Sequence, residues 1–301
     1  MKVSKKQKSS AAGIIIVVLA AALSQLGLLK PNDRQEVQET NQPTIEVVQN
    51  APDASSPSTI EYPSQQSSSS YRVDRMEIPK GYSLGKGQRI DHTGHSLYYN
   101  EDLKTPAWVA WEITREEASR RNVEREVEFN PDPMIDGAKA YFYDYNSSGY
   151  DRGHMAPAGD MKWDSNAMEE VFYMSNICPQ NHELNAGDWN DLEMKTRYWA
   201  KKYGKVYVVC GPIYRTKQPK RIGTHRVAVP DAFFKVILFN KGKNNPVAAG
   251  FLFENNEEHK QLQDRMVTVD ELEKLLNMNF FSMMPDKIEN EIEAELPELF
   301  N

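Results

Sequence analysis

Arg152, His154 and Asn185 carry side chains that together can cleave a phosphodiester bond. Hydrolysis of that bond needs a base to deprotonate water, a divalent cation to hold the phosphate oxygens, and a fixed positive charge against the charge that develops. His154 can serve as the base, Arg152 as the fixed charge, and Asn185 as a holder of the metal. The three residue types therefore predict a metal-assisted phosphodiester-cleaving site.

His154 ends the sequence Asp151-Arg152-Gly153-His154, which is typical of a tight turn. Glycine lets the backbone approach its neighbours closely, and the carboxylate of Asp151 can orient adjacent groups by hydrogen bonds. We therefore expect an imidazole that is held in one direction. Taken alone, each residue has a simpler interpretation, because a histidine in a loop is commonly a surface residue and an asparagine before a helix is commonly its cap.

Asn185 precedes a helix-like run from Asp188 to Tyr203. Asn185, Trp189 and Glu193 follow one another at intervals of four, which places them near one face of a helix. One helix would then present an amide oxygen and a carboxylate to the same ion. A site with so few protein ligands suits Mg²⁺, which keeps several of its waters, and other divalent cations such as Mn²⁺ remain alternatives.

Three blocks in a fixed order make this pattern more specific: Asp-Arg-Gly-His-Met-Ala-Pro-Ala-Gly from residue 151, Tyr-Met-Ser-Asn-Ile-Cys-Pro-Gln from residue 173, and Leu-Asn-(x)3-Trp-(x)2-Leu-Glu from residue 184. Together with Gly-Pro at 211–212 and the segment 227–236, they resemble the DNA/RNA non-specific endonuclease family, over roughly residues 90 to 280. The resemblance implies an α+β domain with the ββα-metal (His-Me finger) nuclease fold, in which helices flank a central mixed, mainly antiparallel sheet.

The resemblance also assigns roles to single residues. It implies that His154 is the general base, Asn185 the direct protein ligand of Mg²⁺, and Glu193 a carboxylate that holds metal-bound water. It further implies that Arg152 binds phosphate and that Asn176 is a polar residue that positions the site.

Several residues near these blocks depart from the pattern or invite other chemistry. Phe172 stands where some secreted relatives carry an asparagine, and Cys178 stands where a small residue is usual. Whether Cys178 and Cys210 form a disulfide is left open by the sequence. His92 and His95 are spaced like a metal pair, but without a third ligand we expect them to be surface residues.

The net charge of −7 argues against a nucleic-acid partner until its distribution is considered. Between Met194 and Lys243 there are 13 Lys or Arg residues against the single acid Asp231, whereas the acids concentrate after residue 254. A basic zone directly after the site helix is what binding to a phosphate backbone needs. An ordinary solvated surface is the alternative. The expected nucleic-acid-binding residues are Arg125, Lys217, Lys220 and Arg221.

Residues 1 to 30 have the composition of an export segment. Four lysines lie among the first ten residues, and Ala11 to Leu29 is uncharged and apolar. The apolar run is close to the ~20 residues that span a bilayer. We therefore expect a transmembrane anchor that holds the protein outside the cytoplasm, in the periplasm or at the cell surface. Cleavage near Ala20 to Ala22, which would give a secreted protein, is the alternative.

The remaining chain divides by composition. Residues 31–75 are rich in Ser, Gln and Pro and are expected to form a disordered linker. Residues 76–285 are expected to form the endonuclease domain, followed by an acidic tail at 286–301. Apolar and β-branched content predicts strands, and helical patterns predict short helices at 115–122 and 268–276. The expected strands are 96–99, 107–113, 206–209, 226–229, 233–239 and 247–253.

The sequence thus favours an Mg²⁺-dependent endonuclease that hydrolyses DNA and RNA with little sequence preference, because it contains no base-reading motif. Its expected partners are DNA and RNA as substrates, and a membrane through residues 1 to 30. Two alternatives remain. A non-catalytic nucleic-acid-binding or uptake protein would need only the basic zone, and a metal-dependent phosphodiesterase for small substrates would need only the site.

Overall fold

The structure is a computed structural model that describes residues 75–81, 85–125, 128–242 and 245–300. The chain forms two units, Met1–Ser68 and Ser69–Asn301, and every described residue belongs to the second. The expected anchor at 1–30 lies outside the described residues, as does the expected linker up to residue 74.

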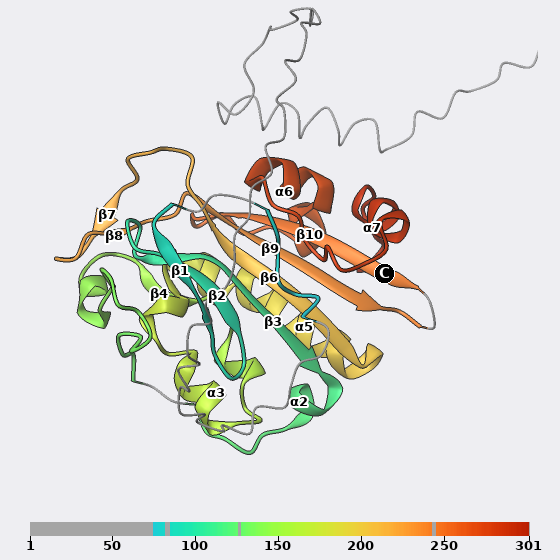
Figure 1. Cartoon of the computed structure of the whole chain (residues 1–301), viewed down its shortest axis with the longest axis horizontal. Helices are drawn as coiled ribbons and strands as arrows, with labels where there is room; N and C mark the ends of the chain where they lie inside the picture. The colour runs from blue at the N-terminus through green and yellow to red at the C-terminus, as the bar shows by residue number, and fades with distance from the viewer. Residues whose placement is uncertain (1–74, 82–84, 126–127, 243–244, 301) are drawn as a thin grey trace, which may run out of the picture. The chain divides into compact units, whose positions relative to one another are not determined.

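The described part is built around one sheet of seven strands in the order β1-β2-β3-β6-β9-β10-β11 (Figure 1). All of its neighbouring strands pair antiparallel. Its members are β1 (Gly87–Asp91), β2 (Ser96–Asn100), β3 (Thr105–Thr114), β6 (Lys205–Ile213), β9 (Ala232–Asn240), β10 (Pro246–Glu254) and β11 (Met266–Val267). The α+β class expected from the sequence is confirmed, and the sheet is antiparallel rather than mixed.

Short elements surround the sheet. Two small antiparallel pairs lie apart from it, formed by β4 (Asp151–His154) with β5 (Ile177–Gln180) and by β7 (Arg221–Ile222) with β8 (Val227–Ala228). The helices are α2 (Arg115–Ser119), α3 (Ser165–Glu170), α4 (His182–Ala186), α5 (Asp188–Tyr203), α6 (Val269–Leu276) and α7 (Asp286–Glu293), and the 3-10 turns are η1 (Phe142–Tyr145), η2 (Ala158–Asp160), η3 (Met174–Asn176) and η4 (Leu262–Arg265).

Helices cover both faces of the sheet, which explains why β9 is apolar along almost its whole length. On one face of the sheet, Phe233 of β9 packs against Trp189 of α5, with 5.6 Å between the ring centres. On the opposite face, the next residue, Phe234, packs against Phe280, which follows α6 in the chain, with 5.7 Å between the ring centres. Because successive side chains on a strand point to opposite faces, α5 and the α6 region lie on different sides of the sheet.

The expected strands are confirmed within a few residues of their predicted ends, and the capping box that opens α6 is present, since the Glu271 amide donates to Thr268 Oγ1 over 3.2 Å. The predicted helix at 115–122 is shorter, because α2 ends at Ser119. Trp108, Trp111 and Trp199 are buried in the core.

The acidic C-terminal residues are part of the packing. After α7 the chain brings Leu299 and Phe300 against the main core. The Phe300 ring lies 6.0 Å from Trp199 and 6.4 Å from Phe251. Lys241 Nζ donates to the Glu298 carbonyl over 2.5 Å. Leu299 and Phe300 therefore pack on the α5 side of the sheet.

Candidate active site

Asp151 to His154 form the strand β4 rather than the expected tight turn. Its pairing with β5 places Arg152 and His154 on one face, because they are two residues apart. Gly153, between them, faces the other way. A Cβ atom built there would lie 2.1 Å from Gln180 Oε1 and 2.6 Å from Gln180 Cβ, so a larger residue at this position would clash with the buried Gln180 side chain.

His154 is enclosed by aromatic rings, with Phe172 edge-on at 4.8 Å and Phe129 at 5.5 Å. Its carbonyl accepts a hydrogen bond of 3.2 Å from Trp189 Nε1, which ties β4 to α5. Its Nε2 atom is buried and has no hydrogen-bond partner among the described residues. Burial, reinforced by the charge of Arg125, lowers the pKa of His154 to about 3, so the imidazole is neutral at physiological pH.

Asp151 sets the direction of the Asn185 amide. Asn185 Nδ2 donates to Asp151 Oδ2 over 2.9 Å, and His182 Nδ1 lies 2.8 Å from the same oxygen. An ionised carboxylate can only accept hydrogen bonds, so the amide must turn its nitrogen towards Asp151. The amide oxygen of Asn185 is thereby left for another partner. The hydrogen bond to Asp151 raises the pKa of His182.

The expectation that Asn185, Trp189 and Glu193 share one helix face is wrong. Asn185 lies in α4, and the chain breaks at Gly187 (φ −100°, ψ −114°) before α5 begins. A Cβ atom at Gly187 would lie 2.5 Å from the Glu183 carbonyl oxygen, so this break depends on glycine. The break resets the helical phase, and Trp189 points into the core, where it is 1% exposed.

Glu193 reaches the same cavity from α5. Burial raises its pKa to about 7, against the opposing influence of the positive charges on Lys235 and Arg197. Arg197 is itself fixed, because its Nη1 donates to Asp160 Oδ1 over 2.8 Å. The other oxygen of Asp160 accepts from Trp111 Nε1 over 3.0 Å. The carboxylate of Glu193 therefore lies in a positively charged, partly apolar environment.

Asn176 is wholly buried and fully used in hydrogen bonds. Its Oδ1 accepts from the Ala156 amide, and its Nδ2 donates to the carbonyls of Ala156 and Val171, each over 2.9 Å. Asn176 thus holds the backbone two residues after His154 and is not among the residues that line the cavity.

These elements enclose a cavity of 540 Å³. Five of the expected site residues line it: Arg125, Arg152, His154, Asn185 and Glu193. Three further polar residues were not foreseen: Lys162, Asn190 and Arg197. Asn190, Glu193 and Arg197 are spaced by three and four, so the helical period of α5 alone could have identified them once its start was known.

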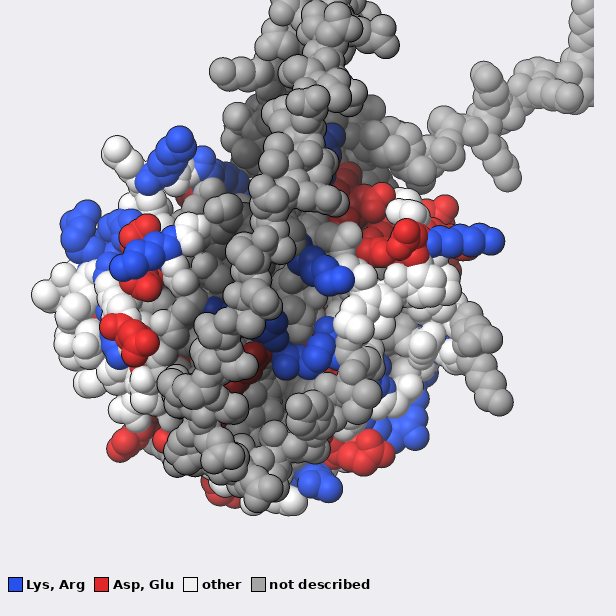
Figure 2. All heavy atoms as spheres, viewed as in Figure 1, with Lys and Arg blue, Asp and Glu red and all other residues white. Residues whose placement is uncertain are grey.

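Lys217, Lys220 and Arg221 do not line the cavity. Lys220 Nζ lies 3.2 Å from the Tyr150 hydroxyl, one residue before β4. Arg221 is held internally, since its Nη1 donates to the carbonyls of Asp102 (2.9 Å) and Arg226 (2.8 Å). Figure 2 shows Lys and Arg side chains gathered at the left, where Figure 1 places β7 and β8. Acidic side chains lie among them, and Lys220 is the basic residue that reaches the segment next to β4.

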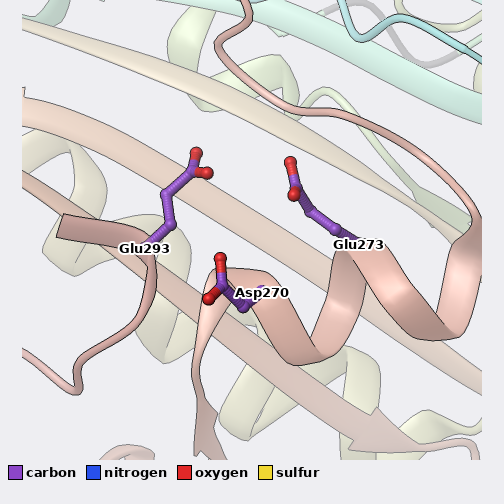
Figure 3. Close-up of side chains that lie close together, drawn as sticks. All are labelled: Asp270, Glu273 and Glu293. Carbon is purple, nitrogen blue, oxygen red and sulfur yellow. The ribbon is translucent and has the colours of Figure 1, made fainter. Parts of the chain in front are cut away.

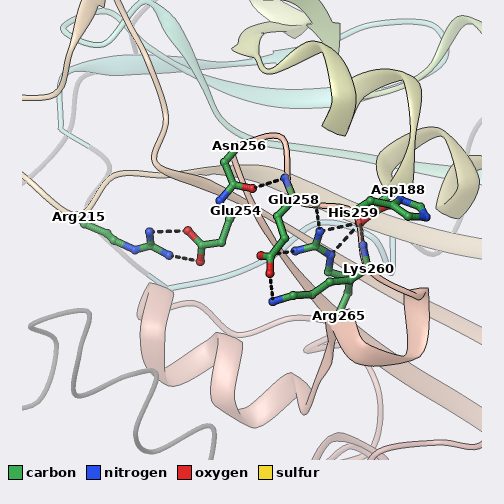
Figure 4. Close-up of polar contacts among 8 residues, drawn as sticks. All are labelled: Asp188, Arg215, Glu254, Asn256, Glu258, His259, Lys260 and Arg265. Carbon is green, nitrogen blue, oxygen red and sulfur yellow. Dashed lines mark hydrogen bonds and ion pairs between the residues drawn. The ribbon is translucent and has the colours of Figure 1, made fainter.

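The basic residues that lie close together in the sequence do not lie together in the structure. Lys235 is buried inside the sheet, 1% exposed. Arg215 is neutralised by Glu254 through two hydrogen bonds of 2.7 and 2.6 Å (Figure 4). Residues that are neighbours in sequence therefore do not form one continuous basic surface.

An ionic cluster fixes the beginning of α5 (Figure 4). Arg265 donates to Asp188 Oδ2 from Nε (2.9 Å) and from Nη2 (2.6 Å), and the Lys260 amide donates to the same oxygen over 3.0 Å. His259 also pairs with Asp188. Although burial alone would raise it, these partners lower the pKa of Asp188. The helix that carries Glu193 is therefore anchored at its first residue.

The remaining side chains considered from the sequence are structural. Cys178 and Cys210 are both buried free thiols, so they do not form a disulfide. The expectation that His92 and His95 lie on the surface is wrong. His92 Nε2 lies 3.0 Å from the buried Asp132, and His95 is 2% exposed. The turn between β1 and β2 folds both rings inward, 4.8 Å apart.

Comparison with known proteins finds a matching family model and similar nucleases. Residues 77–287 match the family model described as DNA/RNA non-specific endonuclease. The chain is 38% identical over 219 residues to mitochondrial nuclease EXOG of Xenopus laevis, covering 68% of this chain and 61% of that protein. It is 30% identical over 216 residues to mitochondrial endonuclease G of Homo sapiens, covering 68% and 73%. The chain thus spans about three fifths of the length of the Xenopus laevis relative.

A solved structure of an EndoG/EndoGI complex is similar to this chain with a TM-score of 0.64 and 28% identity, covering 71% of this chain and 92% of that chain. Together with the antiparallel sheet and its flanking helices, this similarity confirms the ββα-metal nuclease fold expected from the sequence.

The expected extracytoplasmic, membrane-anchored location is wrong. The relatives named above are mitochondrial nucleases, as is a relative in Saccharomyces cerevisiae that is 35% identical over 208 residues, covering 62% of this chain and 63% of that protein. Among the described residues, no helix has the length and apolarity needed to cross a membrane. Even α5, with 16 residues, is short for a span and is heavily charged. The apolar segment Ala11 to Leu29 lies outside the described residues.

Proposed function

Because the chain belongs to the DNA/RNA non-specific endonuclease family, we propose that it hydrolyses phosphodiester bonds in DNA and RNA. The reaction would use a divalent cation, and Mg²⁺ is the cation that we expect. The observation that supports this proposal most strongly is the protonation and hydrogen bonding of His154. A neutral imidazole whose buried Nε2 has no partner in the described part of the chain, in a cavity shared with Arg152, is suited to take a proton from water.

The residues present fit a hard cation. The Asn185 amide oxygen is left available by Asp151, and the Glu193 carboxylate lines the same cavity. Both are oxygen donors, and a site with few protein donors suits an ion that keeps much of its water. A cation bound there would supply positive charge to the phosphate and to the leaving oxygen. Asn185 would hold it, and Glu193 would orient water bound to it.

Arg152 is prepared to bind a phosphate. Its Nε donates to the Phe142 carbonyl (3.0 Å) and its Nη2 to Asn146 Oδ1 (2.8 Å). Its guanidinium also lies over the Phe129 ring at 5.6 Å. A guanidinium already held in place loses little freedom when it binds an anion, so Arg152 can stabilise developing charge without reorganisation.

The substrate would be recognised through its backbone. Arg125 and Lys162 line the cavity beside Arg152, and these three cations can bind phosphate without reading base edges, whereas Arg197 lines it while paired with Asp160. This arrangement supports cleavage with little sequence preference. It also disfavours a purely binding protein, which would not need a neutral imidazole with a partner-free Nε2 between these cations.

The proposal is tested with the full chain on supercoiled plasmid and on a structured RNA. We expect both to be degraded with Mg²⁺ and to survive with EDTA. A small phosphodiester such as bis(p-nitrophenyl) phosphate should be a much poorer substrate, because it engages fewer of the cations. A control variant, Glu116→Gln, changes an exposed residue of α2 that does not line the cavity and should leave cleavage unchanged. Binding of plasmid without any Mg²⁺-dependent cleavage would refute the proposal.

A further inference from the structure

Helices α6 and α7 meet through three carboxylates, away from the candidate active site. Asp270 and Glu273 come from α6, and Glu293 is the last residue of α7. One oxygen of each lies within 4.8 Å of the other two, and the side chains point towards one another (Figure 3). Such a grouping needs an explanation, because like charges at this separation repel.

The repulsion between the carboxylates matters most at Glu293, because this residue is 2% exposed and its Oε1 atom has no hydrogen-bond partner among the described residues. Burial, followed by the charges of Glu273, Glu289 and Asp270, raises the pKa of Glu293 to about 9. The charged groups that act on it are thus acids. A buried oxygen with neither a donor nor a cation is destabilising, so a missing partner is indicated.

The neighbouring groups in the part of the chain that the structure describes do not supply that partner. The amide of Phe280 donates to Glu273 Oε1 over 2.6 Å, and Lys80 acts on Glu289 rather than on Glu293. Glu293 also ends a helix, where the backbone carbonyls carry a partial negative charge. Figure 2 shows acidic side chains gathered at the upper right, where Figure 1 places α6 and α7. The local potential therefore favours a cation.

We propose that Asp270, Glu273 and Glu293 form a calcium site that joins α6 to α7. Carboxylate oxygens are the ligands that Ca²⁺ prefers, at about 2.4 Å and in flexible geometry. Two such bonds span about 4.8 Å, the limit within which the three oxygens lie. Mg²⁺ requires shorter bonds and a stricter octahedron, so it fits this site less well. A bound ion would also satisfy the buried oxygen of Glu293.

The site would be structural, because it lies on the other side of the sheet from the cavity. Leu272 of α6 packs at Gly250 of β10, which pairs with Val236 on the face away from α5. From Glu293 the chain runs on to Phe300, which contacts Trp199 of α5. Calcium would thus fix the point at which the C-terminal residues leave α7.

The experiment measures thermal unfolding of the full chain, first freed of metal with EDTA and then titrated with CaCl₂ or MgCl₂ at pH 7.5 without nucleic acid. At a 100-fold excess over Kd, we expect Ca²⁺ to raise Tm by about 5 °C or more and Mg²⁺ to raise it less. Equilibrium dialysis with radioactive calcium should show the same site directly.

Variants separate this site from the cavity. Glu293→Gln and Asp270→Asn should lose the calcium-dependent rise in Tm, and the second change lies at an exposed position, so it keeps the fold testable. Glu291→Gln, an exposed change in the same helix, should retain the rise. Asn185→Ala should retain it as well. If Ca²⁺ left Tm unchanged, or if Asn185→Ala abolished the rise, the proposal would be overturned, and the carboxylates would be held together by a shared proton.

Discussion

The ammonium group of Lys235 lies 3.7 Å from the centre of the Trp189 indole ring, inside the protein. Its Nζ atom is buried and has no hydrogen-bond partner among the described residues. Burial lowers the pKa of Lys235, while Glu193 is the first of the charges that oppose this effect. Trp189 in turn donates to the carbonyl of His154. A buried cation in the sheet is therefore coupled to two residues of the cavity.

Lys235→Met should move the acid limb of the activity profile to higher pH. Lys235 lowers the pKa of Glu193, which is about 7, so removing the positive charge raises that pKa and delays ionisation as pH increases. We expect a displacement of about one pH unit in kcat/KM at fixed Mg²⁺. Lys287→Met, a change at an exposed position, is the control. An unchanged profile in a folded variant would separate Lys235 from the site.

His154→Ala should reduce the cleavage rate at least about a hundredfold, the lower range for loss of a positioned general base. Circular dichroism should show that the variant remains folded. Because the pKa of His154 is lowered to about 3, its protonation should not limit wild-type activity between pH 5 and 7. A rate close to that of the wild type in His154→Ala would remove this residue from the mechanism.

Asn185→Ala should raise the Mg²⁺ concentration needed for half-maximal cleavage without abolishing DNA binding. Asp151→Asn should have a milder effect of the same kind, about 10- to 100-fold, because an amide at 151 no longer dictates which way the Asn185 amide faces. The measurements are Mg²⁺ titrations of activity and fluorescence anisotropy of labelled DNA. Loss of DNA binding with unaltered Mg²⁺ dependence would instead make Asn185 a structural residue of α4.

Changing Lys217, Lys220 and Arg221 to Ala should weaken binding to unrelated duplexes about equally and flatten the plot of log affinity against log salt. Each lost phosphate contact should reduce the slope by roughly 0.9. Arg221 already donates to two carbonyls, so we expect two contacts rather than three, or about 1.8 in total.

The matched control for this surface replaces Lys195, Lys201 and Lys202, which lie on α5 and do not line the cavity. This second triple variant should retain the wild-type slope. The opposite pattern, with only the α5 variant flattened, would place the binding surface on α5 instead.

The sequence grouped residues from two motifs that lie more than 30 residues apart in the chain. Arg152, His154, Asn185 and Glu193 all reach one cavity as expected. The face of α5 was misjudged, because the break at Gly187 changes the helical phase and this depends on a close backbone contact that no local pattern reveals.

The same distinction holds for the fold. Long strands such as β9 and β10 were predictable from continuous apolar runs. The β4-β5 pair was not, because its strands have four residues each and β4 is polar, so neither alternation nor β propensity marks them. The burial of Lys235 was equally hidden, since it depends on Trp189, a distant residue in the sequence.

The packing of Phe300 on Trp199 and Phe251 has a practical consequence for handling the protein. Loss of Phe300 by carboxypeptidase trimming would remove the ring that covers Trp199 of α5 and Phe251 of β10. Exposed apolar patches of this kind promote self-association. Trimmed molecules should therefore lose solubility on storage before they lose their catalytic residues, and an affinity tag is better placed ahead of the folded domain than behind it.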